Sequence, residues 1–237
     1  MTGQEASPRL ALVIGGYGAL GAAISVALTT SGLRVLRSSR VEGAGEDPDR
    51  VILDPVSAGS EDFRRLPELD AVVWAHGVNV NDSLDQFDNA AFEHLVDVNV
   101  GTIARNIRDL LGAGRLRDGA RLVVISSIWE QVARPGKLSY TVSKAAVGGL
   151  IRAAALDLGS RSILINAVLP GVVDTDMTRA TLTPEQVTSA ATGTAFNRLV
   201  TAAEVADVVG YLCSPGNTAV TGQSIHVDLG FSLAHPL

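Results

Sequence analysis

The sequence predicts an α/β protein with a doubly wound, Rossmann-like parallel sheet of about seven strands and helices on both faces. Apolar runs of strand length alternate with segments of helical periodicity, and a glycine-rich turn follows the first run. The chain has 237 residues, of which 46% are hydrophobic and 19% charged, enough for one well-buried domain and few for two. We therefore expect residues 1–237 to form a single domain.

Buried parallel strands read as short apolar runs, and seven such runs occur in order. They are Arg9–Ile14, Arg34–Ser38, Val51–Leu53, Ala71–Ala75, Arg121–Ser126, Ile163–Leu169 and Ser224–Asp228. Crossover helices are expected at Ala19–Ser31, Ser57–Leu66, Ala90–Leu111, Tyr140–Leu158 and Ala202–Leu212. Residues 173–195 follow neither pattern, and we expect an irregular substrate loop there, because long loops in compact domains are more often functional or mobile than idle.

The overall composition argues against several kinds of partner. The net charge is −6 and the sequence pI is about 5.2, whereas nucleic acid or an anionic membrane requires a concentrated basic patch. No apolar run approaches the roughly 18 residues of a membrane span, and Met1–Pro8 lacks the pattern of a signal peptide. The single cysteine, Cys213, allows no intrachain disulfide and no Cys cluster for a metal. We expect a cytoplasmic protein without a bound metal.

A glycine-rich turn between the first strand and the first helix predicts dinucleotide binding. Gly16, Gly18 and Gly21 satisfy the pattern G-x-G-x-x-G, in which the early glycines let a pyrophosphate approach and the last packs helix against strand. The helix N-terminus then offers free N–H groups to the phosphates. Such turns also arise for purely structural reasons, but this one stands where the fold binds a dinucleotide. The expected contacts are Gly15, Gly16, Tyr17, Gly18, Leu20 and Gly21.

The end of the second predicted strand favours NADP(H) over NAD(H). The residue that reads the adenosine ribose should lie about ~20 positions beyond the glycine turn. Ser39 and Arg40 stand there, and the first carboxylate comes only at Glu42. An arginine pairs with the 2′-phosphate of NADP, whereas a carboxylate accepts from the 2′-hydroxyl of NAD. The alternative is a solvated surface arginine.

Tyr140 and Lys144 are four residues apart, so on a helix they share one face. A nearby cation favours the phenolate and lowers the pKa of the tyrosine from about ~10, which makes acid–base chemistry feasible near pH 7. Ser127 ends an apolar run and should emerge at the carboxyl end of a strand, where such sheets bind ligands. Taken alone, the Tyr–Lys pair is more typical of an ordinary helix surface.

Together, these elements resemble the short-chain dehydrogenase/reductase family over essentially the whole chain. The family's motifs occur here in its order: the glycine turn, Asp54, Ala75–His76–Gly77, Asn99, Ser127, Tyr140 with Lys144, Pro170–Gly171 and Thr221–Gly222–Gln223. The resemblance implies that Tyr140 gives a proton to the substrate oxygen, that Ser127 hydrogen-bonds this oxygen, and that Lys144 holds the nicotinamide ribose and lowers the tyrosine pKa. Hydride comes from the cofactor, so no metal is needed.

The resemblance assigns further roles. Asn99 corresponds to an asparagine that holds a relay water, although a mid-helix amide can also act only as a local cap or kink. Asp54 corresponds to an adenine-contacting aspartate, and it also suits a simple Asp-Pro turn. The remaining cofactor contacts implied by the family pattern are Ala75, Gly77, Pro170, Gly171, Val173 through its backbone and Thr175 through its hydroxyl.

The chain also departs from the family pattern. Ile14 and Ala19 replace a threonine and a glycine of the usual loop, and Trp74–Gly77 replaces an Asn-Asn-Ala-Gly turn, so side-chain amides are lost for which a His76 hydrogen bond would compensate. Four further residues are candidates for lining a substrate pocket: Trp129, Glu130, Gln131 and Met177. Trp129 and Met177 equally suit interface or lid packing.

We predict an NADP(H)-dependent enzyme that transfers hydride between nicotinamide and a ketone or secondary alcohol, with carbonyl reduction as the expected direction. One alternative is a dihydropteridine- or enone-type reductase, whose glycine loop is similar, although Ser127 suits a carbonyl better. The other is a catalytically silent dinucleotide-binding protein. The resemblance also implies a homo-oligomer, tetramer or dimer, packed through small residues of the Tyr140 helix, Ala145, Gly148 and Gly149, which equally suit helix–sheet packing.

Overall fold

The fold was described from a computed structural model, which covers residues 8–41 and 47–233 and, at Met177 and Thr181, the backbone only. Seven strands form one sheet in the order β3-β2-β1-β4-β5-β6-β9, and every neighbouring pair is parallel. The predicted doubly wound sheet is confirmed. The strands are β1 (Leu10–Ile14), β2 (Arg34–Ser39), β3 (Arg50–Ile52), β4 (Leu69–Trp74), β5 (Leu116–Ile125), β6 (Leu164–Pro170) and β9 (Ser224–Val227).

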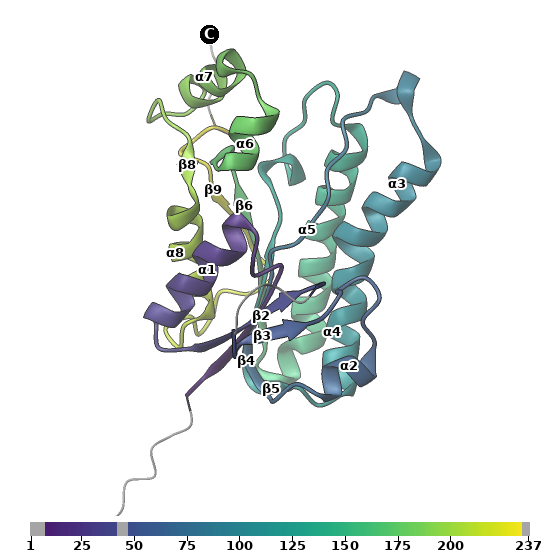
Figure 1. The fold of residues 1–237 in the computed structure, drawn as a ribbon, viewed down its shortest axis with the longest axis vertical. Helices are drawn as coiled ribbons and strands as arrows, with labels where there is room; N and C mark the ends of the chain where they lie inside the picture. Colours follow the sequence, from purple (N-terminus) through teal and green to yellow (C-terminus); the bar gives the residue numbers. More distant parts are fainter. Residues whose placement is uncertain (1–7, 42–46, 234–237) are drawn as a thin grey trace, which may run out of the picture.

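Helices cover both faces of the sheet (Figure 1). On one face lie α1 (Ala19–Thr30) and α8 (Ala202–Cys213); on the other lie α2 (Ser60–Arg64), α4 (Thr102–Gly112) and α5 (Leu138–Leu158). Successive side chains of a strand point to opposite faces. Accordingly Leu12 packs with the α4–α5 layer and Val13 with the α1–α8 layer, and both are fully buried.

The order of the strands creates a crevice at one edge of the sheet. The chain runs outward from β1 to β2 and β3, then returns to place β4 on the other side of β1. In open parallel sheets, ligands bind outside the carboxyl ends of the strands at such a reversal. The glycine turn, residues 75–78 and Ser127 all follow the carboxyl ends of β1, β4 and β5.

The expected helix over Ala90–Leu111 is wrong in one respect, because its middle is not α-helical. Asp88 caps α3 (Asn89–Val96) by accepting a hydrogen bond from the Ala91 N–H at 2.7 Å. A π-helical turn over Asp97–Gly101 then leads into α4. Such turns occur where side chains are held from outside the helix and are frequent at functional sites.

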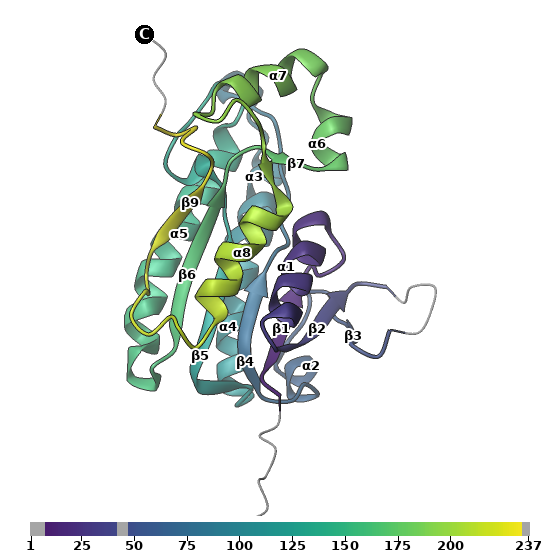
Figure 2. The ribbon, with the colours of Figure 1, turned by 90° about the vertical axis from the view of Figure 1, so that its left-hand side faces the viewer.

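The expectation of an irregular segment at residues 173–195 is also wrong. It contains β7 (Val173–Asp174), α6 (Asp176–Thr181) and α7 (Pro184–Thr192), and β7 pairs with β8 (Val200–Thr201). Thr175 caps α6, and Thr183 with Gln186 forms a capping box for α7. Threonines that resemble loop composition in the sequence therefore start two short helices. Figure 2 shows these helices beyond the carboxyl ends of the strands.

Smaller differences concern boundaries. The strand expected at Arg121 begins at Leu116 instead, and its first part contains Gly119 with a φ of 76°. Short 3₁₀ turns complete the elements, at Leu84–Gln86, Ile128–Glu130 and Gly159–Arg161. Within residues 8–41 and 47–233, no helix is both long and apolar enough to cross a membrane.

Candidate active site

A pocket of about 660 Å³ opens at the carboxyl ends of the central strands. It brings together residues from the glycine turn, the ends of β4, β5 and β6, the start of α5, and helices α6 and α7. The sequence-predicted residues that line it are Gly18, Leu20, Ala75, Gly77, Ser127, Tyr140, Lys144, Gly171, Val173 and Thr175. The structure therefore gathers most of the predicted constellation around one cavity.

The glycine turn leaves no room for a side chain at Gly16 or Gly21. Gly15 has a φ of 80°, and its N–H donates to the Ser38 hydroxyl at 3.0 Å. A Cβ atom at Gly21 would lie 2.1 Å from the Gly15 carbonyl oxygen, and one at Gly16 would lie 2.8 Å from the Arg37 Cβ. The turn ends at Gly18, the N-cap of α1, where no side chain caps the helix. The free N–H groups beside the pocket fit a pyrophosphate.

The three cofactor contacts predicted after the second and third strands, Ser39, Arg40 and Asp54, lie outside this pocket. Ser39 ends β2 and Arg40 follows it; the Ser39 hydroxyl donates to the Val41 carbonyl at 2.6 Å, and Arg40 is exposed. The Asp54 carboxylate accepts from the Val56 N–H at 3.1 Å, and the Asp54 carbonyl accepts from the Ala58 N–H at 2.8 Å. Asp54 therefore forms the turn that its Asp-Pro sequence also suggested.

A basic cluster beside the glycine turn was missed by the sequence analysis. The guanidinium carbons of Arg37 and Arg50 lie 5.1 and 4.7 Å from the ring centroid of Tyr17. Arg50 donates to the Tyr17 hydroxyl at 3.0 Å, while Tyr17 and Arg37 both donate to Asp47. Arg37 and Arg50 are register partners in β2 and β3, a pairing that the sequence does not reveal.

Ser127, Tyr140 and Lys144 all line the pocket. Ser127 follows β5 and is buried, and its hydroxyl accepts from the Trp129 N–H at 3.4 Å. Tyr140 lies in the first turn of α5, and Lys144 one turn later is only 4% exposed. The Lys144 ammonium lies 5.6 Å from the Tyr140 ring centroid and donates to the Ile125 carbonyl at 3.3 Å.

The electrostatics of this group differ from our expectation. Burial raises the pKa of the Tyr140 phenol, and a hydrogen bond with Ser127 only partly opposes the shift. Burial also lowers the pKa of Lys144 to about 8, against the attraction of Glu130. The expected lowering of the tyrosine pKa by Lys144 is therefore not found. The physical reason is that both groups are removed from water, which disfavours their charged forms.

Asn99 lies behind the pocket wall. Its amide nitrogen donates to the Val78 carbonyl at 2.9 Å and to the Ser143 hydroxyl at 3.1 Å, and its amide oxygen accepts from the Val78 N–H at 2.9 Å. The side chain is 1% exposed and lies within the π-helical turn. It thus clamps the chain after β4 beside α5. A Cβ at Gly77 would lie 3.2 Å from the Asn99 amide oxygen and 3.7 Å from the Lys144 ammonium nitrogen.

His76 does not make the compensating hydrogen bond that the altered turn suggested. Neither buried ring nitrogen has a hydrogen-bond partner of full geometry among the described residues. Burial, and then the charge of Lys144, lowers the pKa of the imidazole to about 4, although the Val98 backbone and Asp54 act in the opposite direction. His76 is therefore neutral near pH 7 and lines the pocket.

Two cationic side chains complete the wall beside Tyr140. The Lys137 ammonium lies 5.3 Å from the Tyr140 ring centroid, and the Arg134 guanidinium lies 5.6 Å from that of Trp129. Both cations and Trp129 line the pocket. The sequence shows a lysine three residues before Tyr140. The direction in which its side chain points, however, depends on where α5 begins.

The remaining candidates for the pocket wall are placed elsewhere. Glu130 is buried and accepts from the Ser224 hydroxyl at 2.5 Å, and Gln131 is exposed; neither lines the pocket. The Met177 side chain lies outside the described residues. Pro170 ends β6 next to Gly171. In the described parts of the chain, no group of three or more His, Cys, Asp or Glu side chains could hold a metal ion.

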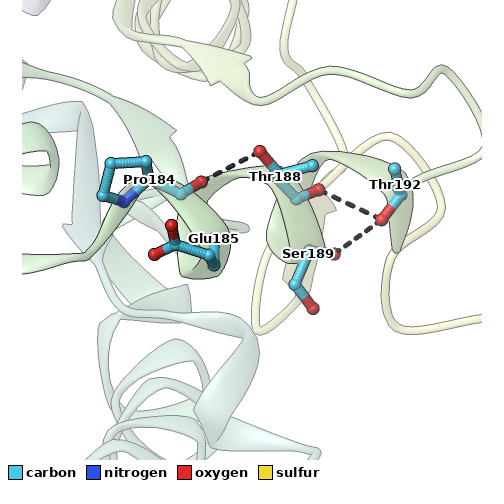
Figure 3. Close-up of a pocket in the computed structure, with 5 residues that line it drawn as sticks. All are labelled: Pro184, Glu185, Thr188, Ser189 and Thr192. Atoms are coloured by element: carbon cyan, nitrogen blue, oxygen red, sulfur yellow. Dashed lines mark hydrogen bonds between the residues drawn. The ribbon is translucent and has the colours of Figure 1, made fainter.

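A second hollow of about 430 Å³ runs along α7 (Figure 3). The Thr188 hydroxyl donates to the Pro184 carbonyl at 2.9 Å, and the Thr192 hydroxyl donates to the Thr188 carbonyl at 3.0 Å. These hydroxyls are thus bonded to the helix backbone. Because the hollow contains none of the predicted catalytic residues, the chemistry belongs to the first pocket.

Sequence comparison relates most of the chain to known oxidoreductases. The family model described as Enoyl-(Acyl carrier protein) reductase matches residues 58–232. The 3-oxoacyl-[acyl-carrier-protein] reductase of Pseudomonas aeruginosa is 33% identical over 230 residues, 95% of this chain and 92% of that protein. Nodulation protein G of Rhizobium sp. (strain N33) is 30% identical over 243 residues, 97% of this chain and 99% of that protein.

Structural comparison agrees with the sequence relatives. A short-chain dehydrogenase/reductase from Serratia marcescens BCRC 10948 has a TM-score of 0.85 and 29% sequence identity, over 94% of this chain and 98% of that chain. A short-chain dehydrogenase family protein from Francisella tularensis has the same TM-score at 23% identity, over 96% of this chain and all of that one, and shares the fold.

The glycine turn gives a direct test of cofactor binding. Gly21→Ala places a methyl group against the Gly15 and Gly16 backbone, which cannot move aside, so we expect the dissociation constant of NADPH to rise about tenfold or more. Gly18→Ala should cost less, because its nearest contact would be 3.5 Å. Gly112→Ala, with open space around the added methyl, is the control. NADPH affinity is measured by fluorescence titration. An unchanged affinity in Gly21→Ala would contradict the assignment of the glycine turn to cofactor binding.

Proposed function

Because the chain belongs to the short-chain dehydrogenase/reductase family, we propose that it is an NADP(H)-dependent oxidoreductase that reduces a ketone to a secondary alcohol in the pocket around Tyr140. The observation that carries this proposal is the convergence of Ser127, Tyr140 and Lys144 on one cavity that also contains the glycine turn. A nicotinamide cofactor, when bound, supplies the hydride.

The residues that would hold this cofactor line one side of the pocket. The glycine turn and the start of α1 would bind the pyrophosphate. Lys144, with one hydrogen bond to the Ile125 carbonyl, has further donors for a ribose. The preference for NADP(H) rests on Arg40, on the neighbouring Arg37 and Arg50, and on Ser39 where a carboxylate would select NAD(H).

The proton chemistry follows from the burial of Tyr140. A raised pKa keeps its phenol protonated near pH 7, as a proton donor to a carbonyl oxygen must be. Ser127 would donate a second hydrogen bond to this oxygen. Lys144, with a pKa of about 8, is mostly charged at neutral pH and would stabilise the phenolate that remains after the proton has left. These protonation states favour carbonyl reduction as the direction.

We propose that Asn99 acts as a positioning residue, which holds the pocket wall in place. Its clamp on Val78 fixes the segment that contains Gly77, which lies against both Asn99 and Lys144. In the family the corresponding amide holds a relay water; here its amide nitrogen is bonded to Val78 and Ser143. The amide oxygen, with one bond to the Val78 N–H, has a second acceptor site for such a water.

A homo-oligomer packed through α5 is part of the proposal. Val142 and Leu156 are 43% and 84% exposed on this helix, and Ala145 is exposed between them. Gly149 has open space around its missing side chain, so another helix has room to approach. Gly148, in contrast, faces inward, since a Cβ there would lie 2.5 Å from a Glu130 carboxylate oxygen.

Tyr140→Phe tests the proton donor, because it removes the hydroxyl and keeps the ring beside Lys144. We expect kcat for ketone reduction to fall by about 10²–10⁴-fold. NADPH oxidation should be followed with ketones, enones, dihydropterins and a 3-oxoacyl thioester, the last because of the similarity to a 3-oxoacyl-[acyl-carrier-protein] reductase. Retained turnover in Tyr140→Phe would contradict this role, and NADPH binding by the unaltered protein without turnover of any compound would favour a silent binding protein.

Arg40→Ala tests the cofactor preference. Losing a charge-assisted contact to the 2′-phosphate should lower the ratio of kcat/KM for NADPH over NADH about tenfold or more. Arg117→Ala, which removes an arginine paired with Glu68 and Asp70 at the far end of the sheet, is the matched control. If the ratio changed in Arg50→Ala and not in Arg40→Ala, the 2′-phosphate contact would be assigned to the cluster around Tyr17 instead of to Arg40.

Sedimentation velocity tests the oligomer. The unaltered protein should sediment as a dimer or tetramer, and Leu156→Arg should shift it towards monomer by placing a charge in the interface. Leu84 is similarly exposed, at 83%, and belongs to the short 3₁₀ turn Leu84–Gln86 outside α5, so Leu84→Arg serves as the control. A monomeric unaltered protein would remove this part of the proposal.

A further inference from the structure

The pocket beside Tyr140 is lined by cations and by no carboxylate. Arg134, Lys137 and Lys144 line it, whereas none of its described lining residues is Asp or Glu. The chain as a whole has a net charge of −6, so this local excess of cations runs against the overall composition. Lys144 is already assigned to the cofactor ribose, and two cations therefore have no assigned task.

Lys137 is placed in a way that calls for an anion. It is only 6% exposed, and its ammonium donates to the Asn79 amide oxygen at 2.7 Å. An ammonium has three donors, and burying it beside a neutral partner alone is costly. Burial, followed by the charge of Arg134, lowers the pKa of Lys137, while Asp82 acts in the opposite direction. An anion in the pocket would relieve both unfavourable effects.

The nearby Asp82 carboxylate is committed elsewhere. One of its oxygens accepts from the Ser139 N–H at 3.0 Å and the other from the Ser139 hydroxyl, which ties residue 82 to the first turn of α5. Asp82 does not line the pocket. Arg134 has a ring contact with Trp129 and no ion pair among the described residues. Its guanidinium is thus available to a ligand beside Lys137.

The distance from Lys137 to the proposed proton donor limits the ligand. The ammonium lies 5.3 Å from the ring centroid of Tyr140, and Lys137 is the N-cap residue of the helix that contains Tyr140. At this spacing, a carbonyl whose oxygen meets Tyr140 and an anionic group that meets Lys137 can belong to one small molecule, a few bonds apart. Asn79, bonded to Lys137 through its oxygen, has its amide nitrogen as a further donor for the same anion.

We propose that the substrate is an oxo acid, with its carboxylate one or two carbon atoms from the reacting carbonyl and bound by Lys137, Arg134 and Asn79. The inference rests on the proposed carbonyl reduction and adds the substrate class. A carboxylate suits this site because an ammonium and a guanidinium form charge-assisted hydrogen bonds with its two oxygens. Reduction gives the corresponding hydroxy acid, with the hydride on the carbonyl carbon and the proton on its oxygen.

The test compares each acid with its uncharged ester. NADPH-dependent kcat/KM is measured for 2-oxobutanoate and 3-oxobutanoate, for their methyl esters, for dihydroxyacetone phosphate and for acetoacetyl-coenzyme A. We expect at least one acid to exceed its own ester about tenfold or more. Lys137→Met should reduce this acid-to-ester ratio about tenfold, mainly through the KM of the acid, and Lys137→Arg should retain most of it. Arg134→Gln should reduce it less, because Arg134 is exposed.

Arg152→Gln is the matched control, because Arg152 is an exposed cation of the same helix outside the pocket lining, and its acid-to-ester ratio should not change. A second readout needs no turnover: butanoate, which has the carboxylate and no carbonyl, should alter the fluorescence of Trp129 in the unaltered protein and not in Lys137→Met.

Three results would overturn the inference: esters or the thioester reduced as well as the acids, the phosphorylated ketone preferred to both acids, or no fluorescence response to butanoate in the unaltered protein. As long as some ketone is reduced, each of these results contradicts only the oxo-acid inference and not the proposed carbonyl reduction. Absence of turnover with every carbonyl compound would overturn both proposals.

Discussion

The burial of both faces of a parallel sheet is the constraint on which the rest of the structure depends. Strands such as β1, with Leu12 towards one helix layer and Val13 towards the other, can only exist between two covering layers. Building both layers from one chain forces the strand order to reverse between β1 and β4. The reversal separates the loops at the carboxyl ends, and the pocket occupies the space between them.

Removal from water, more than any single charge pair, sets the electrostatics of the pocket. The same burial keeps the Tyr140 phenol protonated, brings the pKa of Lys144 to about 8 and keeps His76 neutral. A sequence shows that Tyr140 and Lys144 share a helix face and not how far they are desolvated. The expectation of a lowered tyrosine pKa rested only on the four-residue spacing of Tyr140 and Lys144. Burial of both side chains instead determines the direction in which the pKa of Tyr140 shifts.

Features that depend on local pattern could be predicted, and features that depend on pairing between segments could not. The apolar run that ends at Ser127 and the four-residue spacing of Tyr140 and Lys144 placed these groups at one sheet edge. The neighbours Arg37 and Arg50 meet only through the register of β2 and β3. The clamp between Asn99 and Val78 likewise joins residues 21 positions apart through a π-helical turn. At residues 173–195, the capping roles of Thr175 and Thr183 become visible only with the short helices that follow them.

Helix α5 connects the functions proposed for separate parts of the molecule. Lys137 is its N-cap residue, its first turn contains Tyr140, its second turn contains Lys144, and its outer face contains the exposed Leu156. Gly148 lets the buried Glu130 lie against the same helix, where its charge acts on Lys144. Because a helix moves largely as a rigid body, a partner subunit docked on its outer face would restrict the positions of the cation, the proton donor and the ribose contact together. Assembly would then contribute to the precision of the active site without adding a residue to it.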